Sequence, residues 1–257
     1  YDYLRNNIKL NKKLKVILDA GNGTGGVVAV PIMKEMGQDV TGLYCDMDGR
    51  FPNHHPDPTV EKNIAVLRQT VLDTKADVGI GYDGDADRIG VIDNEGNIIW
   101  GDYLMIIFAR DVLKAHKGAT FVSEVKCSKN LYEEVEKSGG KPIMWKAGHS
   151  LIKQKMKETN ALLGGEMSGH IFFADKFFGY DDAIYASLRL LEIMGNSDKP
   201  LSAYLRDLPK LYSTPEIRID CPDNVKFQVV KRLTEFYKAR YKVIDIDGVR
   251  VILDEGW

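Results

Sequence analysis

Three aspartates at alternating positions, Asp83, Asp85 and Asp87, follow directly after an apolar run in the segment DGDADR. In a loop, alternate side chains can turn toward one point, and three carboxylates brought together repel one another unless a cation lies among them. Oxygen-only ligation suits Mg²⁺ or Ca²⁺, with Mn²⁺ also possible. Arg88, the next residue, adds a forked guanidinium donor that suits a phosphate. The segment predicts a divalent-metal site beside a phosphate; the competing interpretation is a solvated acidic turn.

The spacing of this segment excludes a calcium-binding EF-hand loop. With Asp83 as loop position 1, position 6 would be Arg88 instead of glycine, and position 12 would be Asn94 instead of glutamate. Three protein oxygens leave an incomplete coordination shell, which favours Mg²⁺ together with a phosphate ligand.

A second polar group is bracketed by glycines in the segment GGEMSGH, residues 164–170. Alternation at Glu166, Ser168 and His170 predicts that a carboxylate, a hydroxyl and an imidazole point the same way. A carboxylate that accepts hydrogen bonds from two neighbouring hydroxyl groups is a common way for a protein to bind a sugar. The competing interpretation is a tight turn with incidental polar residues.

Two further candidates, Lys126 and His149, follow the segments FVSEV and MWKAG, at the C-terminal ends of two predicted strands. The carboxyl ends of strands in α/β sheets are where ligand sites gather. Each residue alone is typical of a protein surface, but together with residues 164–170 they favour one substrate-binding edge.

The glycine-rich segment 21–26, GNGTGG, fits the dinucleotide-binding pattern GxGxxG, with Asp46 twenty residues past its last glycine. The competing interpretation is a glycine turn that lets a helix approach a sheet closely. His54 and His55 lie in the proline-rich run 51–58, where a rigid structural turn competes with a two-histidine metal site.

The elements that must position these residues follow an α/β order, because short apolar runs alternate with amphipathic segments. This order predicts two consecutive three-layer α/β/α domains with mostly parallel mixed sheets, at residues 1–99 and 100–208, and a truncated α+β unit at 209–257. The predicted strands are 14–18, 39–44, 77–81, 89–93, 98–99, 120–125, 141–145, one opening at 162–163, 216–220, 242–246 and 249–253. The predicted helices are 27–36, 59–75, 103–116, 129–138, 150–159, 181–194 and 225–237.

The bulk composition narrows the class of protein. The 257 residues include 35 basic and 37 acidic side chains, a net charge of −2, which gives no support to nucleic-acid or membrane-surface binding. Three cysteines without a CxxC pair predict reduced thiols and a cytoplasmic location. No apolar run approaches the roughly 20 residues of a membrane helix, and the first residues resemble no signal peptide. Both ends of the sequence are typical of cuts within a longer chain.

Taken together, these motifs resemble the α-D-phosphohexomutase superfamily. The resemblance rests on the metal loop DGDADR at 83–88, the sugar loop GEMSGH at 165–170, DAGNGTGG at 19–26, FPNHHPDP at 51–58, WKAGHSLIK at 145–153 and DGVRV at 247–251. These segments resemble the second, third and opening fourth domains of the family. With methionine at position 167, the GEMSGH form of the sugar loop resembles phosphomannomutase/phosphoglucomutase members of the family. Phosphoglucosamine mutase is the second most similar type. The resemblance makes the dinucleotide interpretation a remote one.

The resemblance implies a Mg²⁺-dependent enzyme that interconverts hexose 1-phosphate and hexose 6-phosphate of mannose, glucose or both, through a phosphoserine and a hexose bisphosphate. It implies that Asp83, Asp85 and Asp87 hold the ion, and that Arg88, Lys126 and His170 are candidates for catalysis. Lys126, His149, Glu166, Ser168 and His170 are the implied substrate contacts. No T-A-S-H-N-P-like or R-x-S-N-T-like segment occurs, so domain 1 and most of domain 4 are expected elsewhere. The chain alone is expected to be inactive; a non-catalytic metal- and sugar-phosphate-binding fragment is the alternative.

Overall fold

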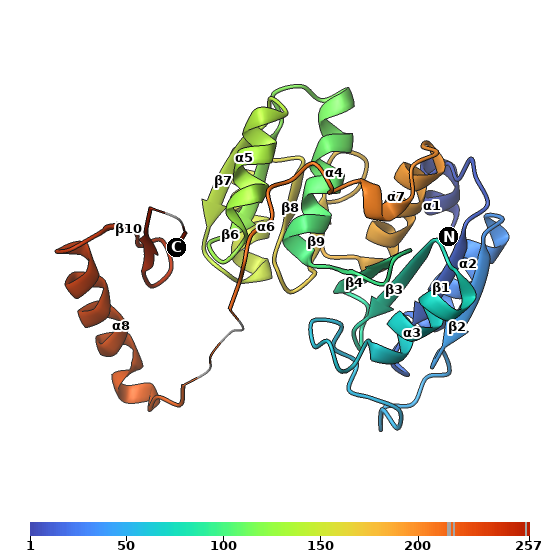
Figure 1. The fold of residues 1–257 in the computed structure, drawn as a ribbon, viewed down its shortest axis with the longest axis horizontal. Coiled ribbons are helices and arrows are strands. Elements are labelled where there is room, and N and C mark those ends of the chain that lie inside the picture. Colours follow the sequence, from blue (N-terminus) through green and yellow to red (C-terminus); the bar gives the residue numbers. More distant parts are fainter. Residues whose placement is uncertain (215–216, 218, 255) are drawn as a thin grey trace.

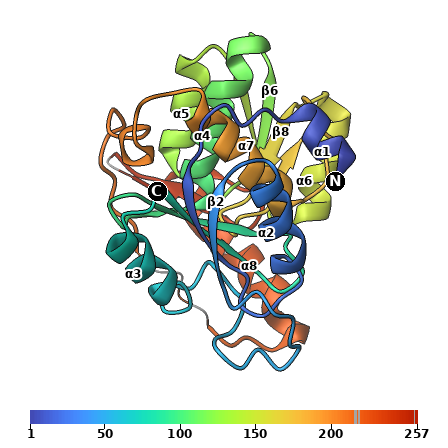
Figure 2. The same cartoon turned by 90° about the vertical axis from the view of Figure 1, so that its right-hand side faces the viewer.

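The computed structural model describes residues 1–214, 217, 219–254 and 256–257. Its described elements form two sheets with helices around them, followed by a separate helix and hairpin (Figure 1). A short helix, α1 (Asp2–Asn7), precedes the first sheet. The view turned by 90° shows α2 and α3 lying apart, with strand β2 between them (Figure 2).

The first sheet has the strand order β2-β1-β3-β4-β5, in which β1 is parallel to β2 and β3, while β4 and β5 are antiparallel to their neighbours. Its strands are β1 (Lys15–Asp19), β2 (Asp39–Leu43), β3 (Val78–Tyr82), β4 (Ile89–Asp93) and β5 (Ile98–Ile99). Its helices are α2 (Gly26–Glu35) and α3 (Ala65–Thr74).

The alternation of side chains along β1 explains why helices cover both faces. Val16 and Leu18 belong to the same apolar cluster as Ile32 of α2, whereas Ile17 belongs to a second cluster with Leu67 of α3. Successive residues of a strand point to opposite faces, so an uninterrupted apolar strand needs cover on both sides.

The second sheet repeats this plan with the order β7-β6-β8-β9, in which only the edge strand β9 is antiparallel. Along β6, Phe121 joins the cluster of α4 and α5, while Val122 packs with Ile152 of α6. The elements are α4 (Gly101–Ala115), β6 (Thr120–Glu124), α5 (Lys129–Lys137), β7 (Lys141–Trp145), α6 (His149–Thr159), β8 (Leu163–Gly165) and β9 (Ile171–Phe173). Both sheets together confirm the predicted α/β class with parallel-rich mixed sheets.

Helix α7 (Ala183–Gly195) joins the two sheets, because it contacts β4 and α2 of the first as well as β9 and α4 of the second. Tyr82 of β3 and Ser187 of α7 share a buried hydrogen bond of 2.6 Å. One apolar cluster therefore runs from β1 and β3 through α7 and α4 to β6 and β8.

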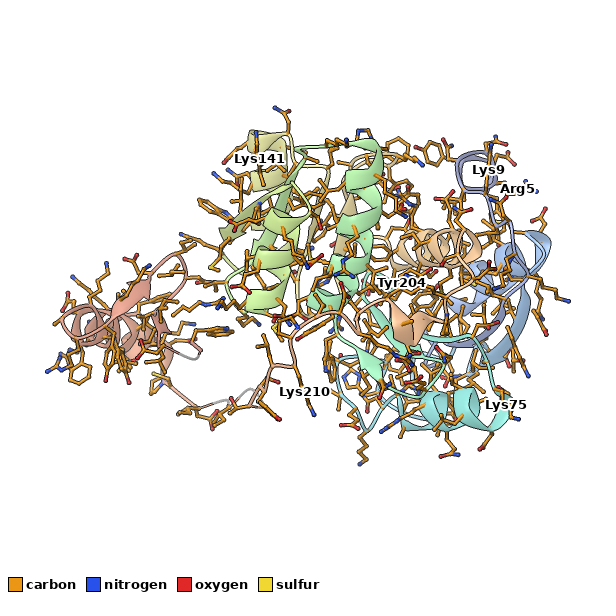
Figure 3. All side chains as sticks on the ribbon, turned by 45° about the horizontal axis from the view of Figure 1, so that its top comes forward. Arg5, Lys9, Lys75, Lys141, Tyr204 and Lys210 are labelled. Atoms are coloured by element: carbon orange, nitrogen blue, oxygen red, sulfur yellow. The ribbon has the colours of Figure 1, made fainter. Side chains whose placement is uncertain are left out.

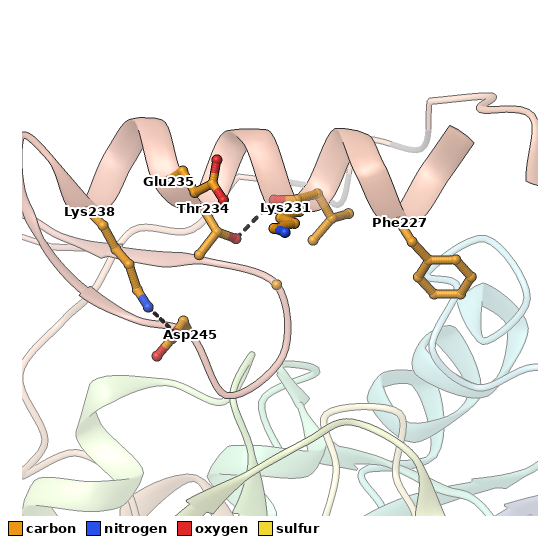
Figure 4. Close-up of a pocket in the computed structure, with 8 residues that line it drawn as sticks. Phe227, Lys231, Thr234, Glu235, Lys238 and Asp245 are labelled. Atoms are coloured by element: carbon orange, nitrogen blue, oxygen red, sulfur yellow. Dashed lines mark hydrogen bonds and ion pairs between the residues drawn. The ribbon is translucent and has the colours of Figure 1, made fainter. Parts of the chain in front are cut away.

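The C-terminal part consists of a 3₁₀ turn (Leu201–Ala203), helix α8 (Asp223–Lys238) and the antiparallel hairpin β10 (Lys242–Ile244) and β11 (Arg250–Ile252). None of the α8 residues is buried. The open hollow between α8 and the hairpin is lined by Phe227 and Thr234, and an ion pair joins Lys238 and Asp245 there (Figure 4).

Arg250 and Asp247, in the hairpin segment, make hydrogen bonds to the second sheet unit. Arg250, 6% exposed, donates from Nη1 to the carbonyl oxygens of Val125 and Cys127, the second at 3.2 Å. The Asp247 carboxylate accepts a 3.0 Å hydrogen bond from the Ala147 N–H. Lys75 and Lys141, by contrast, lie at the outer ends of α3 and β7 (Figure 3).

The structure differs from the sequence-based expectations at three places, and at the first of them the local cause is visible. The helix expected from Thr59 begins only at Ala65, because the Asp57 carboxylate accepts from the N–H and hydroxyl of Thr59 and holds that segment in turns. Helix α1 and strand β9 were not among the predicted elements. The predicted strand 216–220 falls partly outside the described residues, and 217, 219 and 220 have no regular structure. In the described part of the chain, no helix is long and apolar enough to span a membrane.

Candidate functional site

The acidic loop, residues 83–88, joins β3 to β4 and brings its three aspartates together. Carboxylate oxygens of Asp83, Asp85 and Asp87 lie within 4.8 Å of one another. The intervening Ala86 has a φ of 61°, a left-handed conformation that is rare outside glycine, and its carbonyl accepts from the Ala183 N–H at 3.0 Å. The loop thus brings its alternate side chains close to one another, as the spacing predicts, while Asp85 stays exposed to solvent.

The donor set of the acidic loop suits a hard divalent cation. Asp83 is 3% exposed, and burial together with the nearby Asp87 carboxylate raises its pKa, although hydrogen bonds from Arg88 oppose the shift. A buried carboxylate with like charges beside it is stabilised when a cation shares its oxygens. Carboxylates alone supply the oxygen ligands that Mg²⁺ prefers. The three aspartates therefore fit the ion that the sequence predicts.

Arg88 is fixed by two carboxylates. Its Nε donates to Oδ2 of Asp83 at 2.8 Å, and its Nη1 lies 3.3 Å from Oδ1 of Asp57. Burial lowers the pKa of Arg88, but the negative charges of Asp83, Asp57 and Asp87 outweigh burial and raise it. The guanidinium is thus a permanent positive charge next to the acidic loop. The sequence placed Asp57 beside the two histidines of the proline-rich run but did not predict its contact with Arg88.

The glycine-rich segment 21–26 packs against the acidic loop. A Cβ atom on Gly23 would lie 2.5 Å from the Gly84 carbonyl oxygen, and the Thr24 N–H donates to that oxygen at 2.9 Å. The close backbone approach that glycine permits here is made with the chain's own loop. This packing supports the glycine turn over a pyrophosphate cradle.

His54, in the proline-rich run, takes a structural position, whereas His55 is exposed. Nε2 of His54 lies 3.1 Å from Oδ1 of the buried Asp19, and its Nδ1 lies 2.9 Å from the His55 carbonyl oxygen. Burial raises the pKa of Asp19, against the opposing hydrogen bonds. Among the described residues, the clusters of side chains close enough to share a metal ion include neither His54 nor His55.

The Glu166 loop, residues 164–170, brings together the three side chains that the sequence pointed out. Glu166 is 5% exposed; its Oε1 accepts from the Gly148 N–H at 2.6 Å, and its Oε2 lies 3.0 Å from Nδ1 of His170. The Ser168 hydroxyl lies 2.9 Å from the same Nδ1 atom. Burial raises the pKa of Glu166, but the contacts with His170 and Gly148 outweigh it, so the pKa is lowered. Glu166 is therefore a buried carboxylate that stays ionised.

The two loops meet at His170. Its Nε2 lies 3.3 Å from Oδ1 of Asp87, and the Ile89 N–H donates to the Gly169 carbonyl oxygen at 3.1 Å. Gly169 has a φ of 95°, and a Cβ there would lie 2.4 Å from the Ile89 oxygen, so only glycine fits. Burial lowers the pKa of His170, but the Glu166 hydrogen bond and the Asp87 charge outweigh burial and raise it.

His149 lies over the ring of His170, with ring centroids 5.4 Å apart. Its Nδ1 is 2.7 Å from Oδ2 of Asp181, whose Oδ1 accepts from Lys153 at 2.9 Å. Burial raises the pKa of Asp181, but the Lys153 and His149 hydrogen bonds outweigh it and lower the pKa. The sequence analysis missed Asp181 and Lys153; both lie in segments whose polar residues alone are typical of a surface.

Lys126 lies two residues beyond the end of β6 and its side chain is half exposed. Its Nζ is 3.5 Å from Oε2 of Glu124, the last residue of β6. The Glu124 Oε1 atom accepts from the Met167 N–H of the Glu166 loop at 2.8 Å. Lys126 and the Glu166 loop are thus connected through one carboxylate, another residue that the sequence did not indicate.

The assembled site offers a three-carboxylate cluster, a guanidinium, a lysine and two imidazoles around one edge of the two sheets. Clustered oxygens can hold a divalent cation, and the cationic side chains can bind a phosphate. The buried Glu166 and the neighbouring Ser168 retain lone pairs for hydroxyl groups of a ligand. These groups could bind a phosphate and position it, which are two of the requirements for phosphoryl transfer.

Comparisons with known proteins agree with this arrangement. Residues 1–96 match the family model of phosphoglucomutase/phosphomannomutase alpha/beta/alpha domain II, and residues 100–212 match that of domain III. A phosphomannomutase/phosphoglucomutase of Pseudomonas putida is 46% identical over 97% of this chain. The match spans 54% of that relative, so the chain covers about half the length of such proteins.

Solved structures resemble the fold as well. A phosphoglucomutase/phosphomannomutase family protein from Burkholderia thailandensis superposes with a TM-score of 0.89 at 42% identity, covering 98% of this chain and 54% of that one. An N-acetylphosphoglucosamine mutase of Aspergillus fumigatus, in complex with GlcNAc-6P and magnesium, has a TM-score of 0.66 at 14% identity, covering 96% of this chain and 63% of that one. The second similarity shows the fold alone. Because two consecutive domain models of one family cover most of the described residues, the chain belongs to the phosphoglucomutase/phosphomannomutase family of phosphohexomutases.

Proposed function

We propose that this chain carries the metal-binding and sugar-binding parts of a Mg²⁺-dependent mutase, which interconverts the 1-phosphate and 6-phosphate of mannose, glucose or both. The observation that carries the proposal is the contact between the acidic loop and the Glu166 loop at Asp87 and His170, 3.3 Å apart. This contact supports a single site in which a phosphate near the carboxylates and a sugar near Glu166 belong to one molecule. The Met167 resemblance supports mannose and glucose over glucosamine.

The division of the chain into units is part of the proposal. We assign the acidic loop to a unit at 1–99, the Glu166 loop to a unit at 100–208, and the opening of a phosphate-binding domain to 209–257. The two separate sheets and the hairpin support this division. The phosphoserine domain and the remainder of the phosphate-binding domain would belong to the longer protein, in line with the half-length coverage of its relatives.

Asp83, Asp85 and Asp87 would hold Mg²⁺, which when bound neutralises charge on a phosphoryl group in transfer. Arg88, held by Asp83 at 2.8 Å, would bind an oxygen of that phosphate. The magnesium present in the structure of the fungal N-acetylphosphoglucosamine mutase supports the choice of ion. Positioning and charge stabilisation are the main requirements for this reaction, and these residues supply both.

Glu166 and Ser168 would bind sugar hydroxyls, and Lys126 and His149 would contact the sugar or its distal phosphate. A sugar hydroxyl that attacks the phosphoserine phosphorus must release its proton, and the leaving oxygen of the reverse transfer must gain one. His170 and Lys126 are the candidates for this proton transfer. His170 lies between the two loops, with its Nε2 3.3 Å from Asp87 and its Nδ1 3.0 Å from Glu166.

The test is a coupled assay on the full-length protein with glucose 1-phosphate and mannose 1-phosphate, with Mg²⁺ and with EDTA. We expect turnover that depends on Mg²⁺ and on hexose bisphosphate as activator. The 257-residue chain alone should show no turnover, because the phosphoserine segment is absent from its sequence. Turnover by this chain alone, or no turnover by the full-length protein with either sugar, would contradict the proposal.

A further inference from the structure

Glu124 is a buried carboxylate that the proposed reaction does not use directly. The residue is 1% exposed, and burial raises its pKa, opposed by Lys126 and the Met167 N–H. Its Oε1 accepts one hydrogen bond, from the Met167 N–H at 2.8 Å. Its Oε2 accepts none from the described residues and lies 3.5 Å from the Lys126 Nζ.

Such a carboxylate is costly to keep. Removing an ionised group from water has a large desolvation penalty, which a single backbone hydrogen bond offsets only in part. Glu166 makes the cost larger, because its negative charge also raises the pKa of Glu124. Buried polar groups with incomplete partners concentrate where function requires them.

Contacts that do not involve the Glu124 side chain hold the backbone around Lys126, including the hydrogen bond from the Cys127 N–H to the Glu124 carbonyl oxygen at 3.1 Å. The Ser128 N–H donates to the Asp102 carboxylate at 2.8 Å, and Arg250 donates to the carbonyl oxygen of Cys127 at 3.2 Å. These contacts hold the segment on the C-terminal side of Lys126. What Glu124 adds is a negative charge under the ammonium of a side chain that is half exposed.

The Glu124 carboxylate also accepts a hydrogen bond from the Met167 N–H of the Glu166 loop. Through it, the same carboxylate that faces Lys126 also holds the backbone between Glu166 and Ser168. Resting on the function proposed above, we infer that Glu124 is a positioning residue. Its ionised side chain holds the Lys126 ammonium at the sugar-phosphate site and sets its place relative to the Glu166 loop.

Two variants distinguish the effect of the Glu124 charge from the effect of its side-chain length. Glu124→Gln removes the charge but retains an oxygen for the Met167 N–H, so the loop should stay folded. Glu124→Asp keeps the charge but shortens the side chain by one methylene. We expect Glu124→Gln in the full-length protein to raise the KM for glucose 1-phosphate about fivefold with a smaller change in kcat, since it weakens a ground-state contact. Glu124→Asp should restore part of the loss.

A double-mutant cycle with Lys126→Met tests whether Glu124 acts through the lysine. In the Lys126→Met background, Glu124→Gln should change the KM less than twofold, because the ammonium it orients is gone. Glu134→Gln is the matched control: Glu134 is also buried, pairs with Arg110 on α4, and lies outside the site. That variant should leave the KM unchanged.

A second measurement needs no mutase activity. Trace acylation of this chain, read by peptide mass spectrometry, should proceed about threefold faster at Lys126 in Glu124→Gln than in the wild type, because the variant removes one of the negative charges that favour the protonated ammonium. The rate at Lys157, a surface lysine of α6, should not change.

Equal KM effects of Glu124→Gln in both backgrounds, or a Lys126→Met variant with unaltered KM, would overturn the inference. Unchanged acylation at Lys126 would overturn it as well. If the full-length wild type shows no mutase activity while the acylation rate rises as expected, the proposed reaction fails but the pairing of Glu124 with Lys126 stands.

Discussion

Nε2 of His170 lies 3.3 Å from Oδ1 of Asp87, although the two residues belong to loops of different sheets. The same imidazole contacts Glu166 through its other nitrogen, at 3.0 Å. A displacement of either loop therefore alters the charge and hydrogen bonding of both. The acidic cluster and the Glu166 carboxylate are coupled parts of one site.

Asp87→Asn should weaken Mg²⁺ binding by tenfold or more, about 1.4 kcal/mol, because the cluster loses one of its three anionic ligands. The measurement is calorimetric titration of this chain with Mg²⁺, repeated with Mn²⁺. Asp73→Asn on the exposed side of α3 is the matched control and should bind both ions as the wild type does. Equal affinity in the wild type and Asp87→Asn would refute the ligand assignment.

Glu166→Ala should reduce the affinity for glucose 1-phosphate about tenfold, since a charge-assisted hydrogen bond contributes roughly 1.5–3 kcal/mol. Titration of the chain with glucose 1-phosphate in the presence of Mg²⁺ measures the effect. Glu158→Ala, an exposed carboxylate on α6, provides the comparison. If both variants bind the sugar phosphate equally well, residues 164–170 do not form the sugar site.

Gly169→Ala should destabilise the fold more than Gly118→Ala. Both glycines have positive φ, 95° and 76°, so both substitutions introduce backbone strain. Only at Gly169 would the new Cβ also meet the Ile89 oxygen, at 2.4 Å, whereas Gly118 faces open space. We expect an additional loss of about 2 kcal/mol in the free energy of unfolding, measured by urea denaturation. Equal losses would mean that the two loops adjust freely to each other.

Asp181 should contribute to the pH dependence of stability. Its pKa is lower in the folded chain than the usual 3.8, because hydrogen bonds from Lys153 and His149 outweigh burial. Its stabilisation is therefore fully present above pH 3.8 and is lost as the pH falls through the lowered folded pKa. The difference in unfolding free energy between the wild type and Asp181→Asn that this titration contributes should stay constant from pH 6 down to about pH 4 and shrink as the pH falls below 3.8.

Urea denaturation at several pH values measures this difference. Lys153→Met removes one of the two hydrogen-bond donors to Asp181, so this variant should lose less stability on acidification than the wild type. A difference between the wild type and Asp181→Asn that stays constant with pH would show that the ion pair does not titrate as a unit with folding.

Much of the fold could be predicted from the sequence, because apolar runs such as Val16–Leu18 must be covered on both faces wherever they lie in the chain. The late start of α3 could not, since it depends on Asp57 holding Thr59 in a turn. The short strand β9 carries too few residues for a periodic signal.

The site was predictable only where chemistry repeats locally. Alternation placed Asp83, Asp85 and Asp87 together, and the same alternation grouped the residues of the Glu166 loop. Glu124 and Asp181 escaped because their partners, Met167 and His149, are more than thirty residues away in sequence. Such pairings depend on how strands and helices pack, and no local spacing encodes them.

Helix α7 covers strand β4 of one sheet and strand β9 of the other. Dividing the chain near residue 99 would therefore expose apolar surface to solvent on each of the two resulting fragments. The two sheet units of the intact chain should unfold in a single calorimetric transition. Transfer of the first unit alone into another protein would require a substitute for helix α7.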